Sequence, residues 1–112
     1  MAFVGYAIKY AYDRHTVHQY LEDSYTRGAD IRQAPFRGDV NVQDWTKKFQ
    51  AWRDETASYL KENLGGMAYE KFLNTGRVSF QYSKDDTLNF GLNQIGDLLA
   101  NLESIISHRE GQ

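Results

Sequence analysis

Apolar side chains recur every three or four residues along most of this chain, which is the spacing of helices that bury one face. The clearest stripe predicts a last helix that starts near Asp86 or Asn89 and reaches about His108. Its apolar positions are Leu88, Leu92, Ile95, Leu99, Leu102 and Ile106, and Leu98 and Ile105 widen the stripe. This helix is therefore expected to pack against its neighbours along its length.

Two further stripes predict long helices earlier in the chain. The first helix is expected over residues 3–33, and Pro35 should end it, because proline disfavours helical geometry at the preceding residue. Its stripe is Phe3, Ala7, Tyr10, Val17, Leu21, Ser24, Gly28 and Ile31. The second helix should run from a cap at Asn41 to Leu64. Its stripe is Trp45, Phe49, Trp52, Thr56, Tyr59, Leu60 and Leu64.

Two sets of small residues predict close contacts between helices. Gly28 marks either a kink or a place where another backbone comes near, since glycine costs about 1 kcal/mol in a helix interior relative to alanine. Gly96, Ala100 and Ser104 form a row at four-residue spacing in the last helix. We expect a neighbouring helix to approach closely along that row.

Between the second and last helices the pattern changes. Gly65 and Gly66 supply a left-handed stop, and a short helix is predicted from about Met67 to Asn74. An extended segment follows near residues 77–86, where apolar and polar residues alternate as in a strand. A single short strand is not stable alone, so this segment pairs with residues 36–40, joins a partner, or is an extended connection. We favour the extended connection, with Asp85 and Asp86 capping the helix that follows.

These elements predict an all-α fold: a compact antiparallel bundle of three longer helices and one short helix. The length of 112 residues suits a single domain, residues 1–112. Residues 1–12 carry one charge and have two interpretations. We favour the start of a buried helix. The other interpretation is the edge of a longer natural chain, where tyrosines and basic residues would lie beside a membrane helix.

Composition excludes several classes of function. The net charge of −2 and the lack of a basic run argue against nucleic-acid binding, which needs clustered cations. The absence of Cys removes disulfides and thiolate sites. No secretory signal and no run of about 20 apolar residues occur, so we expect no membrane insertion by this chain and a cytoplasmic location.

The best candidate for metal chemistry is the set His15, His18 and Glu22 on the first helix, because two imidazoles and a carboxylate form a plausible ligand set. Histidines on a solvent-facing helix surface are common, so we predict neither a metal nor another cofactor. Ser104 and His108 lie one helical turn apart, but nothing indicates an oxyanion hole. The chain is therefore expected not to be an enzyme.

Aromatic residues make up 14% of the chain and include eight tyrosines. Five tyrosines of the first helix cannot all fit on its buried face, so some are expected at the surface. These are Tyr6, Tyr10, Tyr12, Tyr20 and Tyr25. They are our candidate interaction surface.

Several short stretches together resemble a diffuse group of uncharacterised bacterial helical domains. The stretches are Tyr25 to Arg32, Trp45 and Trp52, Tyr59 to Gly65, and Tyr69 with Phe72. The resemblance implies a Trp-bearing helix closed by Leu-Gly and a final Leu-rich helix, and some members of the group follow a membrane segment. It implies no activity and no catalytic residue.

The leading hypothesis is therefore a non-enzymatic protein–protein interaction module, whose partner is another protein or a second copy in a homo-oligomer. A small bacterial or phage inhibitor that works by binding is one form of this hypothesis. The alternative is a small-ligand-binding or sensor domain with a pocket lined by Tyr and Trp. A small enzyme built around His15 and His18 ranks third.

Overall fold

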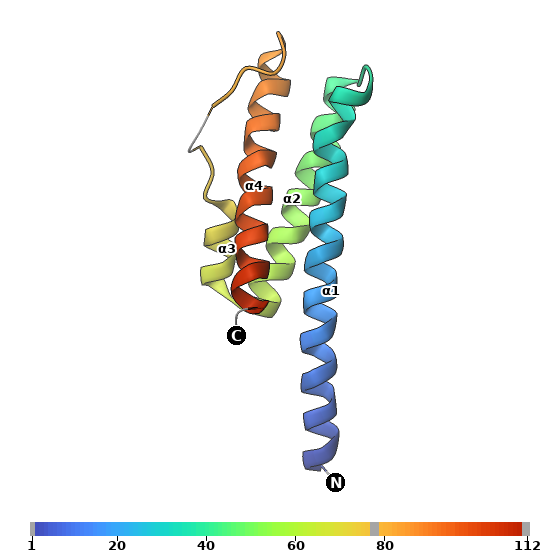
Figure 1. Cartoon of the computed structure of the whole chain (residues 1–112), viewed down its shortest axis with the longest axis vertical. Helices are drawn as coiled ribbons and strands as arrows, with labels where there is room; N and C mark the ends of the chain where they lie inside the picture. The colour runs from blue at the N-terminus through green and yellow to red at the C-terminus, as the bar shows by residue number, and fades with distance from the viewer. Residues whose placement is uncertain (1, 77–78, 111–112) are drawn as a thin grey trace.

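The computed structural model describes residues 2–76 and 79–110, with side chains from 16–76 and 79–108. These residues form four helices: α1 (Ala2–Arg37), α2 (Val42–Leu64), α3 (Gly66–Leu73) and α4 (Asp86–Glu110). Figure 1 shows α1 running antiparallel to both α2 and α4, while the short α3 packs on α2 and α4. The predicted all-α bundle of three longer helices and one short helix is confirmed.

The amino-terminal end of α1 extends beyond the ends of the other helices (Figure 1), so the molecule is 61 Å long but only 24 by 20 Å across. Among the described side chains, the core begins at Val17. The side chains of residues 1–12, for which the sequence left two interpretations, lie outside the described ones. No helix in the described part of the chain combines the length and the apolar character needed to cross a bilayer.

Local signals place most helix ends where the sequence predicts them. The side chain of Asn41 accepts a hydrogen bond from the backbone N–H of Asp44 at 3.0 Å and caps α2. α2 ends at Leu64, and Gly65 follows it with a φ of 96°, which glycine adopts without steric cost. Asp85 caps α4 by accepting a hydrogen bond from the N–H of Leu88 at 2.9 Å.

The predicted end of the first helix is wrong, because α1 continues through Pro35 to Arg37. A proline inside a helix leaves the carbonyl four residues earlier without its usual N–H donor. Here that carbonyl belongs to Ile31, and it accepts a hydrogen bond of 2.8 Å from the indole nitrogen of Trp45. The cost of the proline is thus offset by a side chain from another helix.

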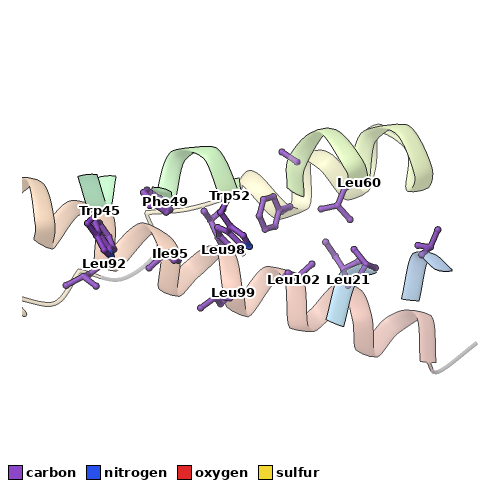
Figure 2. Close-up of a cluster of buried hydrophobic side chains, with 14 of the residues drawn as sticks. Leu21, Trp45, Phe49, Trp52, Leu60, Leu92, Ile95, Leu98, Leu99 and Leu102 are labelled. Atoms are coloured by element: carbon purple, nitrogen blue, oxygen red, sulfur yellow. The ribbon is translucent and has the colours of Figure 1, made fainter. Parts of the chain in front are cut away.

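The core is a continuous cluster between α1, α2 and α4, as Figure 2 shows. Helix α4 contributes the largest share of it, and Phe72 joins it from α3. The buried residues labelled in Figure 2 are Leu21, Trp45, Phe49, Trp52, Leu60, Leu92, Ile95, Leu98, Leu99 and Leu102. All ten lie on the stripes that the sequence predicts for the first, second and last helices.

The two tryptophans of α2 set the register of α2 against α1. Trp52 donates from its indole nitrogen to the carbonyl of Ser24 at 2.8 Å, as Trp45 does to Ile31. The donors are seven residues apart on α2 and the acceptors are seven residues apart on α1. The same contact therefore repeats after one heptad of the antiparallel helix pair.

Each indole also packs over a glycine. A Cβ added at Gly28 would lie 2.4 Å from Cζ2 of Trp52, and one at Gly91 would lie 2.5 Å from Cζ3 of Trp45. Gly28 is therefore the site of a close side-chain approach. The close approach predicted along Gly96, Ala100 and Ser104 is wrong, because no described residue would lie within 4 Å of a Cβ at Gly96 and the other two residues are exposed.

Candidate functional site

Four polar side chains follow one face of α4 at four-residue spacing, which places them above one another along the helix. We call them the polar row: Asn89, Asn93, Asp97 and Asn101. They hydrogen-bond to the backbone of the chain between the end of α3 and the start of α4. The polar row therefore supplies the hydrogen-bond partners that an extended segment ordinarily receives from a second strand.

The carboxyl-terminal half of the row holds the end of α3. Asn101 is buried, and its amide nitrogen donates to the carbonyls of Phe72 and Asn74, each at 2.9 Å. These acceptors lie at the end of α3, where helix carbonyls lack helical partners. Asp97 accepts a hydrogen bond of 2.8 Å from the backbone N–H of Gly76.

The amino-terminal half of the row holds residues 79–83. Asn93 bonds both backbone groups of Phe80, accepting from its N–H and donating to its carbonyl, each at 2.8 Å. The carboxamide oxygen of Asn89 accepts from the N–H groups of Tyr82 and Ser83 at 2.9 and 2.7 Å. The extended connection predicted near 77–86 is confirmed for the residues that the structure describes, none of which forms a strand.

Exposed aromatic rings lie on this segment and on the helices α1 and α4. Phe80 is 59% exposed and Phe90, at the start of α4, is 72% exposed. Phe36, at the end of α1, is 54% exposed and contacts Tyr82 edge to face with ring centroids 5.9 Å apart. Tyr82 also contacts Phe80 at 6.0 Å. We call Phe36, Phe80, Tyr82 and Phe90 the aromatic surface.

A hollow of about 560 Å³ lies between the extended segment and α4. Phe80 and Phe90 contribute apolar walls, and Asn89, Asn93 and Asp97 of the polar row also line it. The hollow is thus continuous with the aromatic surface.

The predicted tyrosine surface is only partly visible in the described side chains. Tyr20 is half-buried, with its ring stacked on Tyr59 at 3.6 Å and its hydroxyl donating to Glu55 at 3.2 Å. Burial is the main reason that the pKa of Tyr20 is raised. Tyr25 is half-buried against the core. Tyr6, Tyr10 and Tyr12 lie outside the described side chains.

The metal candidates are also only partly described. Nε2 of His18 lies 3.1 Å from Oε1 of Glu22, one helical turn away. The side chain of His15 is outside the described set. Within that set, no three His, Asp or Glu side chains come together in a way that could hold a metal ion.

Sequence reasoning missed both the polar row and the aromatic surface. The available signal was the spacing of Asn89, Asn93, Asp97 and Asn101, which puts three amides and a carboxylate on one helix face beside a long connection. Comparison with protein-family models, curated proteins and solved structures finds no match to this chain.

Proposed function

We propose that this chain is a non-enzymatic protein–protein interaction module that binds through its aromatic surface. The observation that carries the proposal is the exposure of Phe36 and Phe80, which both contact Tyr82, and of Phe90, which lines the same hollow as Phe80. Large rings are enriched at the centres of protein interfaces, where their burial supplies much of the binding energy. Grouped exposed rings of this kind indicate a binding surface more strongly than the same rings scattered singly.

The polar row supports the proposal, because it fixes the backbone under the rings before a partner arrives. Phe80 is held through both backbone groups, and Tyr82 is held through its N–H. A surface ordered in advance loses less conformational entropy on binding. The energy of ring burial is then available for affinity.

A small-ligand-binding or sensor domain is the second candidate, and the hollow beside Phe80 and Phe90 is the observation that favours it. Its volume of about 560 Å³ lies within the range of small-molecule sites. Its lining differs from the pocket of Tyr and Trp that the sequence suggested. A metabolite and nucleotide panel monitored by thermal shift tests this candidate, since a specific ligand raises the melting temperature.

Affinity capture from the source cell with matched surface variants tests the proposed function. Phe80→Ser combined with Phe90→Ser removes two rings of the aromatic surface. Met67→Ser is the control, because Met67 is 87% exposed at the start of α3, outside that surface. We expect the control to retain the partner, whether a foreign protein or a second copy, and the double variant to lose it. A chain that is monomeric and captures nothing, or a partner retained by the double variant, contradicts the proposal.

A further inference from the structure

The extended segment has one backbone edge tied to α4 and one edge open. In an extended chain, the N–H and C=O groups of successive residues point to opposite sides. Phe80 directs both groups to Asn93, so those of its neighbours Ser79 and Gln81 point away from α4. Neither neighbour makes a backbone hydrogen bond to another described residue. The open edge thus offers two N–H and two C=O groups.

This edge is complementary to itself. If two copies meet antiparallel about a two-fold axis at Phe80, Ser79 of each copy lies opposite Gln81 of the other. Each of these two pairs exchanges two backbone hydrogen bonds, so four bonds form. Phe80 then lies opposite Phe80 of the second copy, at the narrow position where cross-strand aromatic pairs interact best. The three paired residues carry no charge, so no like charges meet.

The polar row limits how far such pairing can extend. The edge of Phe80 that faces α4 is already occupied by Asn93, so a third strand cannot add to that side. At the carboxyl-terminal end, the N–H of Ser83 bonds to Asn89 and takes no part in pairing. A short edge closed on one side gives a two-fold dimer with an isologous interface, not an open sheet.

We propose that the partner of the aromatic surface is a second copy of this chain, joined through antiparallel pairing of residues 79–81 about Phe80. This inference rests on the proposed function and names its partner. The exposed rings of Phe80 and Tyr82 lie on the segment that pairs, so dimer formation removes apolar area from water as well as forming hydrogen bonds.

The first test introduces a charged side chain at Phe80, on the two-fold axis of the proposed dimer. Analytical ultracentrifugation of the full chain over a concentration series measures self-association. Phe80→Lys and Phe80→Glu each place like charges opposite one another, so each is expected to weaken the dimer by about tenfold or more. An equimolar mixture of the two variants restores dimers, because opposite charges then meet. Met67→Lys is the control with the same change of charge, and it associates as the wild type does.

The backbone donor is the second test. Gln81→Pro removes the N–H that faces the second copy while leaving the Phe80–Asn93 bonds in place. An extended Phe80 is also the conformation that a following proline prefers. We expect Gln81→Pro to lose the dimer at an unchanged melting temperature of the monomer, whereas Gln81→Ala keeps the N–H and the dimer.

These outcomes separate the two proposals. Self-pairing is overturned if the wild-type chain stays monomeric up to about 1 mM. At that concentration, any dimer with a binding free energy stronger than about 4 kcal/mol would be detected. Self-pairing is also overturned if the variants at Phe80 and Gln81 dimerise as the wild type does. If the wild type is monomeric yet captures a foreign protein that the Phe80 and Phe90 double variant loses, self-pairing fails and the proposed function stands.

Discussion

The indole N–H of Trp45 donates to the carbonyl of Ile31 at 2.8 Å, and Pro35 is the reason that this carbonyl needs a donor. A helix interior tolerates proline poorly, because a hydrogen bond is lost and the ring crowds the preceding turn. In α1 the lost bond is replaced from α2. The helix therefore extends through Pro35 to Arg37 and carries Phe36 to the aromatic surface.

This relationship predicts a dependence between Trp45 and Pro35. Trp45→Phe should lower the free energy of unfolding by about 1–3 kcal/mol from the unpaired carbonyl alone, in addition to the loss of ring area. In a Pro35→Ala background the N–H of residue 35 can bond to Ile31, so the same substitution should cost less. Urea unfolding of the four proteins measures the difference. An equal cost of Trp45→Phe in both backgrounds would show that the indole does not compensate for the proline.

The surroundings of three helix glycines predict that replacement by alanine changes stability in opposite directions. Gly28→Ala and Gly91→Ala each drive a Cβ into an indole and should destabilise the fold by about 1–3 kcal/mol, as overpacking does. Gly96→Ala adds a methyl group where no described residue lies within 4 Å, so it should stabilise α4 by up to about 1 kcal/mol. Thermal unfolding compares the three variants. If all three shift the melting temperature in the same direction, the packing at Trp45 and Trp52 is not as described.

The fold was predictable where a local pattern decides the structure. The stripe from Leu88 to Ile106 places α4, and the side chain of Asn41 caps α2 as its position suggests. The predictions of a helix end at Pro35 and of a close helix approach at Gly96 were wrong. Both came from local rules, which describe the residue's own helix and not the side chains that pack against it. The carbonyl of Ile31 accepts from a donor on another helix, and a Cβ at Gly96 would meet no described residue within 4 Å.

The buried hydroxyls of Ser24 and Thr56 lie 2.7 Å apart and join α1 to α2. Removing one hydroxyl leaves the other without this partner, which costs about 1–3 kcal/mol. Ser24→Ala and Thr56→Val should each destabilise the protein, while the double variant should cost less than the sum of the two. Chemical denaturation in a double-mutant cycle gives the coupling. Additive costs would mean that the two hydroxyls do not depend on each other.

Tyr20 predicts a loss of stability at alkaline pH. Burial raises its pKa above the ordinary value of 10.0, so the folded state favours the neutral phenol. The contribution of Tyr20 to the free energy of unfolding is present in full below pH 10. It is lost as the pH rises through the raised pKa of the folded state. Tyr20→Phe should therefore flatten the fall of the melting temperature above pH 10 relative to the wild type. Parallel curves for Tyr20→Phe and wild type would contradict this prediction.

The candidate surface was less predictable than the helices. Asn89, Asn93, Asp97 and Asn101 have the spacing of an ordinary solvated helix face, and nothing in residues 79–83 specifies which amide each backbone group meets. The pairing depends on where α3 ends against α4, which only the packed bundle determines. The exposure of Phe80 follows from that pairing and so could not be read from the alternation of Phe80 and Tyr82 alone.

Hydrogen exchange at two neighbouring amides tests this pairing. The N–H of Phe80 bonds to Asn93, while that of Gln81 points away from α4, so in the monomer the amide of Phe80 should exchange more slowly than that of Gln81. Asn93→Ala should raise the exchange rate of Phe80 and leave that of Leu98, in the core of α4, almost unchanged. Equal protection of Phe80 in wild type and variant would show that Asn93 does not hold the segment. At concentrations where copies pair, the amide of Gln81 should become protected as well, because its N–H then bonds to Ser79 of the second copy.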